Sequence, residues 1–175
     1  MTVACLWLAQ GVAAAPIVPA PPAGSLPGMQ SRARPLPSAA LVAEAVDHTG
    51  LRRVLEQGLY VAGSEREFTG RKAVFNHVVE QVLRFGKGAG ASAYLRWLRV
   101  HTAETIGVPR SVTASTIGTD GFVYRPRGCG CHSETPSYLI AWRRGPLALT
   151  VLASGSGART KTAEALARTL DRTIS

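Results

Sequence analysis

The residues with the most distinctive chemistry in this sequence are Cys129, Cys131 and His132, in the stretch RGCGCH. Two thiols and an imidazole lie within four residues, and Gly128 and Gly130 leave the backbone loose enough for the sulfurs to turn toward each other. Three kinds of chemistry fit this spacing: a local disulfide, thiol–disulfide exchange, and the binding of a soft metal ion.

A disulfide between Cys129 and Cys131 is the simplest interpretation. It closes a very small ring, so it constrains the unfolded chain little and is expected to be strained. A strained, exposed disulfide is easily reduced, and the neighbouring Arg125, Arg127 and His132 favour the reactive thiolate. This redox alternative lacks the C-x-x-C spacing that is typical of thiol oxidoreductases.

Metal binding is the third interpretation, because thiolates are preferred ligands of Cu(I) and Zn. C-x-C is not the usual zinc spacing, and no second cysteine pair exists. Cys129, Cys131 and His132 would therefore need a further ligand from elsewhere in the chain. The candidates are His77, His101 and Glu134. No third group is identifiable that would orient His132 as a catalytic base, so no catalytic residue is predicted and no cofactor is expected.

Length and composition indicate one globular domain. The chain has 175 residues, of which 46% are hydrophobic and 18% are charged, which is enough for a core. The net charge is +9, but the basic residues are scattered and do not gather between aromatic ones. Nucleic-acid binding is therefore not expected. The basic charge suits a protein attracted to an anionic cell envelope.

The N-terminal residues 1–15 resemble the apolar core and cleavage region of a secretory signal, with Val12-Ala13-Ala14 as the small-x-small pattern. The usual positively charged start is missing. Ala4-Cys5 weakly resembles a lipoprotein acylation site, which would associate the protein with a membrane. Residues 16–37 are rich in Pro, Gly, Ala and Ser, and predict an extended linker. Residues 38–175 are then a single domain, in which Cys129 and Cys131 are the only cysteines.

Residues 137–154 predict a β-hairpin at the centre of a sheet. Two apolar runs flank Arg143-Arg144-Gly145-Pro146, and both faces of each run are largely apolar. This pattern indicates central strands with a helix over at least one face. Arg143 and Arg144 lie at the tip, where we expect solvated side chains.

The rest of the chain alternates helical and strand patterns. Residues 73–85 fit both periods, and their Val and Phe content favours a strand. Gly50 is expected to end the first helix. The predicted helices cover residues 39–48, 91–106 and 161–174, with a further turn or two at 51–57. The other predicted strands cover residues 59–68, 111–117 and 122–125. This order predicts an α+β fold, with amphipathic helices packed on a mainly antiparallel sheet.

Three features resemble small extracytoplasmic domains of actinobacterial lipoproteins and kinase sensors, an α+β group of PsbP-like or sensor-like type. They are VLRFG at Val82–Gly86, the WRRGPLALTVLASG hairpin and the closing amphipathic helix, all within Leu59–Ser175. The resemblance implies an envelope protein that binds or senses, and it brings no catalytic signature.

The sequence therefore favours a secreted or envelope-associated, non-enzymatic domain. Its expected partner is an unidentified small molecule or envelope component. The alternatives are a thiol/disulfide redox protein and a Cu(I)- or Zn-binding protein, both using the Cys129–His132 stretch.

Overall fold

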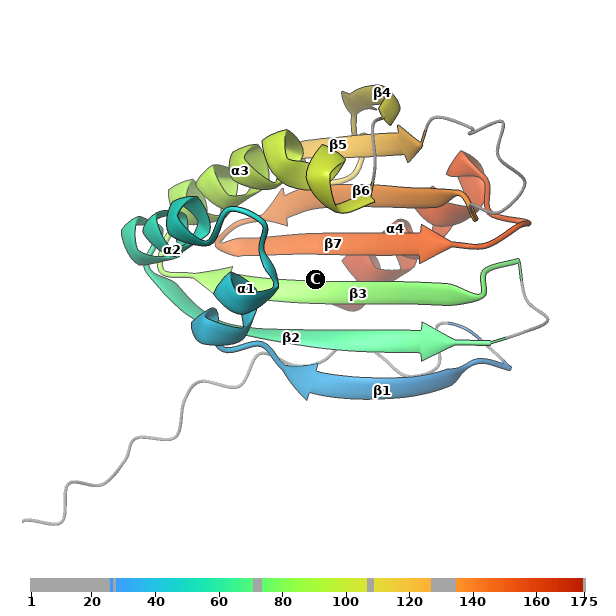
Figure 1. The fold of residues 1–175 in the computed structure, drawn as a ribbon, viewed down its shortest axis with the longest axis horizontal. Helices are drawn as coiled ribbons and strands as arrows, with labels where there is room; N and C mark the ends of the chain where they lie inside the picture. Colours follow the sequence, from blue (N-terminus) through green and yellow to red (C-terminus); the bar gives the residue numbers. More distant parts are fainter. Residues whose placement is uncertain (1–25, 27, 71–73, 107–108, 127–134, 175) are drawn as a thin grey trace, which may run out of the picture.

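The structure is a computed structural model that describes residues 26, 28–70, 74–106, 109–126 and 135–174. Its centre is one antiparallel sheet in the spatial order β1-β2-β3-β7-β6-β5-β4 (Figure 1). The strands are β1 (Gln30–Pro35), β2 (Tyr60–Thr69), β3 (His77–Phe85), β4 (Pro109–Ala114), β5 (Thr119–Pro126), β6 (Ser137–Arg144) and β7 (Leu147–Ser154). The helices are α1 (Ser38–Glu44), α2 (His48–Gln57), α3 (Gly88–Ile106) and α4 (Thr160–Thr173). The predicted α+β fold is confirmed.

Helices cover both faces of the sheet: α1, α2 and α3 lie on one face and α4 lies on the other (Figure 1). Two separate cores result, because successive side chains of a strand point to opposite faces. On β7, Leu149 and Val151 belong to the core under α4, whereas Ala148 belongs to the core under α3. Among the described residues, no helix has the length and apolar character needed to cross a membrane.

The predicted central hairpin is confirmed. Strands β6 and β7 pair in register from Ser137 opposite Ser154 to Arg144 opposite Leu147. Gly145 takes a φ of +52° at the turn, a conformation that glycine adopts without steric cost. Both strands lie inside the sheet and bury both faces, as their continuous apolar character predicts.

The ambiguous residues 73–85 form strand β3 from His77 onward, so the strand prediction is confirmed there. Strand β3 lies between β2 and β7. Val78 and Val82 face the α4 side, while Leu83 and Phe85 face the α3 side. Apolar residues on both faces fit a strand buried on both sides, and their spacing explains why the pattern also matched a helix.

The first helical region was predicted as a helix over residues 39–48 and a further turn or two at 51–57, and the structure instead places the break between α1 and α2 at residues 45–47. The carboxylate of Asp47 accepts the backbone N–H of Gly50 at 2.8 Å and caps the start of α2. Gly50 therefore lies in the first turn of α2, and the prediction that it ends a helix was wrong. An aspartate at the N-cap is a stronger start signal than a glycine three residues later is a stop signal.

Strand β1 lies in the segment that composition indicated as a linker. Residues 30–35 pair with β2 along their whole length, from Gln30 opposite Thr69 to Pro35 opposite Ser64. Leu36, which follows, is buried against α1 and α2. Pro35 is tolerated because β1 is an edge strand with one unpaired side.

Candidate functional site

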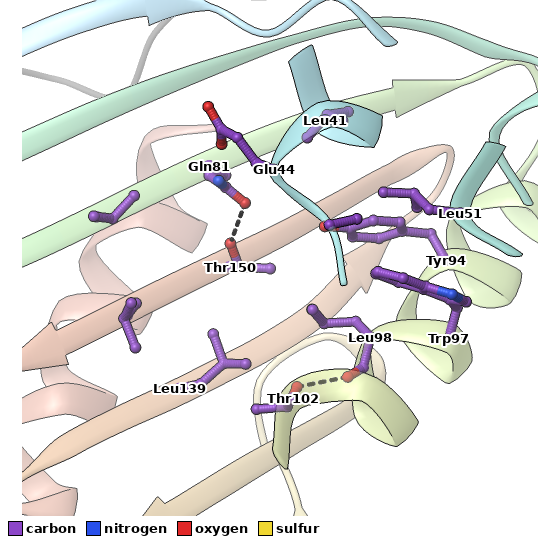
Figure 2. A pocket seen from close by; sticks show the side chains of 13 residues that line it. Leu41, Glu44, Leu51, Gln81, Tyr94, Trp97, Leu98, Thr102, Leu139 and Thr150 are labelled. Carbon is purple, nitrogen blue, oxygen red and sulfur yellow. Dashed lines mark hydrogen bonds between the residues drawn. The ribbon is translucent and has the colours of Figure 1, made fainter. Parts of the chain in front are cut away.

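A cavity of about 180 Å³ lies between the sheet and helices α1, α2 and α3 (Figure 2). Its floor is formed by side chains of β3, β7 and β6, including Gln81, Thr150 and Leu139. Its walls come mainly from α3, and Leu41 of α1 and Leu51 of α2 complete the lining. The lining is predominantly apolar with a few polar groups, which is the usual composition of a small-molecule site.

The α3 wall carries two aromatic rings, Tyr94 and Trp97. Their planes are inclined by 26°, and their centroids lie 6.3 Å apart. The indole of Trp97 also stacks on the imidazole of His101, with ring centroids 4.6 Å apart. Its Nε1–H donates to Asp47 Oδ2 at 3.3 Å. These contacts hold the indole in one orientation, so the two rings form a rigid stacked pair in the α3 wall.

Asp47 is the anchor of this wall. It caps α2, accepts the indole N–H of Trp97, and lies 3.4 Å from His101 Nε2. The backbone N–H of Gly50, and then the indole, lower the pKa of Asp47, because both hydrogen bonds favour the carboxylate. One ionised side chain thus connects the start of α2 to the middle of α3.

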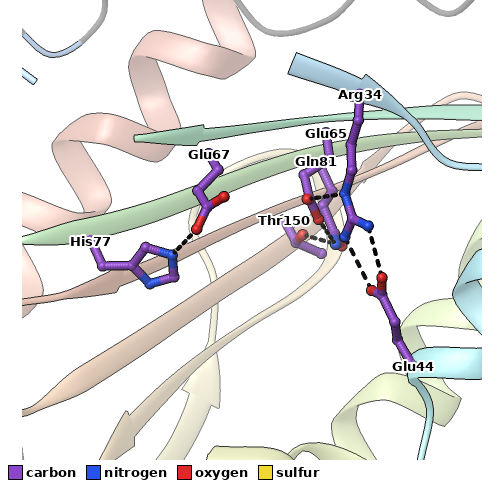
Figure 3. Close-up of polar contacts among 7 residues, drawn as sticks. All are labelled: Arg34, Glu44, Glu65, Glu67, His77, Gln81 and Thr150. Carbon is purple, nitrogen blue, oxygen red and sulfur yellow. Dashed lines mark hydrogen bonds and ion pairs between the residues drawn. The ribbon is translucent and has the colours of Figure 1, made fainter. Parts of the chain in front are cut away.

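A polar row leads across the sheet to the cavity floor. Arg34, Glu65, Gln81 and Thr150 stand directly opposite one another on β1, β2, β3 and β7. Arg34 Nε donates to Glu65 Oε1 at 2.6 Å, and Gln81 Nε2 donates to Glu65 Oε2 at 2.8 Å. Thr150 Oγ1 donates to Gln81 Oε1 at 3.2 Å (Figure 3). The register of four strands therefore assembles one continuous hydrogen-bonded chain.

Arg34 also ties helix α1 to the sheet. Its Nη1 lies 2.8 Å from Glu44 Oε1 and its Nη2 lies 3.2 Å from Glu44 Oε2 (Figure 3). Both carboxylates raise the pKa of Arg34 through their hydrogen bonds. Helix α1 is short, so it depends on such tertiary contacts for its position. Glu44 itself lines the cavity, so the tether reaches its rim.

Tyr94 contributes the least satisfied polar group of the site. The residue is only 4% exposed, and its side chain extends from α3 over the cavity (Figure 2). Burial raises the pKa of its hydroxyl, so the group stays neutral. Within the described part of the chain, no hydrogen bond of this hydroxyl is found. By contrast, Thr102 donates its hydroxyl to Leu98 O at 2.5 Å.

The residues that the sequence singled out lie elsewhere. Cys129, Cys131 and His132 lie outside the described residues, as do Cys5 and Glu134. The disulfide, redox and metal interpretations therefore stay predictions, and the structure adds no support to them.

The two histidines suggested as additional metal ligands are bound to carboxylates. His77 Nε2 lies 2.9 Å from Glu67 Oε1, and His101 contacts Asp47. Among the side chains that the structure describes, no group of three or more His, Cys, Asp or Glu residues is placed to hold a metal ion.

Sequence reasoning missed the cavity, although a signal was present. Gln81 is a polar residue in the middle of the largely buried strand β3, and Thr150 is a polar residue in the middle of the apolar strand β7. A polar residue at such a position needs a partner or a function. Trp97 lies within the helix predicted over residues 91–106, and Arg34 lies in the expected linker.

The fold has a counterpart among solved structures. It is similar to the crystal structure of the extracellular domain of PknH from Mycobacterium tuberculosis, with a TM-score of 0.56, 14% sequence identity and 84% of each chain covered. No protein-family model matches the chain, and no curated protein is significantly similar to it in sequence. At this identity the likeness shows a common architecture. It agrees with the resemblance to extracytoplasmic domains of kinase sensors that the sequence indicated. The chain thus shares its fold with a mycobacterial extracellular domain.

Proposed function

We propose that this chain is an extracytoplasmic, non-enzymatic sensing domain that binds a small molecule between the sheet and helices α1, α2 and α3. The observation that carries this proposal is the cavity, with its rigid aromatic wall and a polar floor connected to the rim. Most binding sites for small molecules combine apolar walls with a few placed polar groups in this way. The shared fold with an extracellular domain supports the location.

Helix α1 is the element that would transmit ligand binding to residues outside the cavity. Leu41 and Glu44 line the cavity, and Glu44 is also bound to Arg34 on the edge strand β1. A ligand that contacts α1 changes the balance between its docked and undocked positions, because it binds one of them better. The signal would then pass from α1 to β1.

Filling the mouth of the cavity is the direct test of this function. Ala45 lines the cavity, whereas the next residue, Val46, is 60% exposed. We expect Ala45→Trp to abolish the binding of small ring compounds, because the indole occupies their space. Val46→Trp should leave binding unchanged.

The measurement is a nuclear magnetic resonance titration of the ¹⁵N-labelled protein with single-ring compounds that are neutral, anionic or cationic. The indole N–H of Trp97 reports on the cavity, and that of Trp142, in the opposite core, serves as an internal reference. At least one compound should shift the Trp97 signal in the parent and in Val46→Trp, but not in Ala45→Trp. The proposed function is wrong if no compound shifts Trp97, or if the shifts persist in Ala45→Trp.

Export can be tested separately. Residues 1–37 fused to an alkaline phosphatase that folds only outside the cytoplasm should give an active enzyme, because residues 1–15 have the apolar core of a secretory signal. A matched fusion that lacks residues 1–15 should be inactive. Equal activity of the two fusions would show that residues 1–15 are not an export signal.

A further inference from the structure

The cavity carries no positive charge, although the protein as a whole is strongly basic. Among the lining residues there is no Lys, Arg or His, and the only carboxylate is Glu44. Both oxygens of Glu44 are already held by Arg34. An anionic group in this space would lose part of its hydration without gaining a cation, which disfavours its binding. A cationic group would find its one counter-ion already paired.

The cavity does offer unused hydrogen-bonding capacity for a neutral group. The Tyr94 hydroxyl has both a donor and acceptor lone pairs, and the described residues take up neither. Gln81 uses one of its two amide hydrogens on Glu65, and its oxygen accepts from Thr150. Thr150 keeps acceptor lone pairs on its hydroxyl oxygen. A buried polar group with spare capacity favours a ligand that satisfies it.

The shape of the cavity limits the rest of the ligand. Tyr94 and Trp97 contribute a stacked aromatic pair to the lining, and Leu41, Leu51 and Leu139 add aliphatic side chains. A volume of about 180 Å³ is close to that of an engineered cavity, roughly 150 Å³, that accommodates one benzene ring. One flat ring with a small substituent therefore fills this space.

We infer that the cavity selects an uncharged ring compound whose hydroxyl or carbonyl group is hydrogen-bonded by Tyr94 and by the Gln81–Thr150 pair. The inference rests on the proposed function and adds the chemical class of the ligand. The cavity would select the ligand by excluding charged groups and by a hydrogen bond to the Tyr94 hydroxyl. The aromatic rings of Tyr94 and Trp97 would supply contact area.

Four compounds built on one methyl-substituted ring test this class: 4-methylphenol, toluene, 4-methylbenzoate and 4-methylbenzylammonium. Each is titrated at pH 7 into the ¹⁵N-labelled protein, with the Trp97 indole signal as the reporter. We expect 4-methylphenol to bind best and 4-methylbenzoate to bind at least tenfold more weakly. Tyr94→Phe should weaken 4-methylphenol roughly three- to tenfold, the usual value of one neutral hydrogen bond.

Toluene and a second variant separate hydrogen bonding from packing. Tyr94→Phe should leave the affinity for toluene unchanged, because toluene has no polar group to satisfy. Tyr138→Phe removes the same hydroxyl from a residue packed in the core under α4 and should change neither affinity.

Each contrary result overturns a defined part of the inference. If 4-methylbenzoate binds as tightly as 4-methylphenol, the ligand class is wrong while the cavity remains a binding site. The same conclusion holds if Tyr94→Phe weakens toluene and 4-methylphenol equally. If none of the four compounds shifts Trp97 but others in the wider set do, the ligand class alone is overturned. If no compound in either set binds, both the ligand class and the proposed function are wrong.

Discussion

Replacing Asp171 with alanine should lower the free energy of unfolding by about 3 kcal/mol, because it leaves the buried indole of Trp142 without an acceptor and removes the ion pair with the partly exposed Arg144. Asp171 on α4 accepts the indole N–H of Trp142 at 2.8 Å, and Trp142 has no exposed surface. The same carboxylate binds the guanidinium of Arg144 through both oxygens. In a chain of this size the loss corresponds to a decrease of about 6–12 °C in melting temperature.

Two conservative variants separate the charge from the hydrogen bond. Asp171→Asn keeps an acceptor for Trp142 but loses the ion pair with Arg144, so we expect a loss of about 1–2 kcal/mol. Asp120→Asn makes the same change in an exposed ion pair, between Asp120 and Arg143, and should cost less than about 1 kcal/mol. Equal effects of the two Asn variants in urea unfolding would refute a structural role for the buried site.

The acid dependence of this contact follows from its pKa. The hydrogen bonds from Arg144, and secondarily from Trp142, lower the pKa of Asp171. Its stabilising contribution is therefore complete above the pKa of the unfolded chain and is lost as the pH falls through the lower folded value. The difference between the parent and Asp171→Ala should be constant from about pH 5 to 8 and should shrink below about pH 4.

Replacing Glu80 with glutamine should have the opposite effect and stabilise the protein at neutral to alkaline pH. Glu80 of β3 is 1% exposed on the α4 face of the sheet. Neither carboxylate oxygen has a hydrogen-bond partner among the residues that the structure describes. Burial raises the pKa of Glu80 to about 7, although the positive charge of Arg66 acts in the other direction. Glutamine removes the cost of ionising this group in a dry environment.

The raised pKa of Glu80 determines at which pH the substitution stabilises the protein. The folded pKa of Glu80, about 7, lies above its ordinary value of 4.5. The carboxylate therefore destabilises the fold most strongly above pH 7, by up to about 3 kcal/mol, and this cost disappears as the pH falls toward 4.5. We expect Glu80→Gln to be about 1–3 kcal/mol more stable than the parent at pH 8 and nearly equal to it at pH 5.

Urea unfolding at several pH values measures this difference. Glu67→Gln is the matched control, because Glu67 lies on the neighbouring strand β2 with 45% of its side chain exposed and is bound to His77. It should change stability by less than about 1 kcal/mol. If Glu80→Gln and the parent show the same pH dependence between 5 and 8, Glu80 is not the buried ionisable group described here.

The architecture could be predicted from local sequence patterns. In residues 137–154, apolar side chains occupy both faces of two short runs around a glycine-containing turn, and only a central hairpin buries both faces. The last helix likewise carries Ala163, Leu166, Ala167 and Leu170 on one buried side, at the period of an α-helix. Such patterns involve residues that are close together in the sequence, so they can be recognised without the tertiary structure.

Local patterns misled where two signals competed. The composition of residues 16–37 indicated a linker, yet residues 30–35 pair with β2. The sequence of one extended segment does not show whether it pairs in a sheet, because its partner strand lies in another part of the chain. Similarly, Gly50 was read as a stop signal when Asp47 three residues earlier began a new helix.

The sequence by itself determined the fold class, the central hairpin and the helices that pack on the sheet, because periodicity and turn residues act locally. Only the tertiary structure decided where the polar residues meet. Arg34, Glu65, Gln81 and Thr150 come from four strands that are distant in sequence, and they align because of strand order and register. A single polar residue has no period to reveal its partner, and a shift of one residue in register would turn it to the opposite face. The candidate site is therefore a product of non-local pairing.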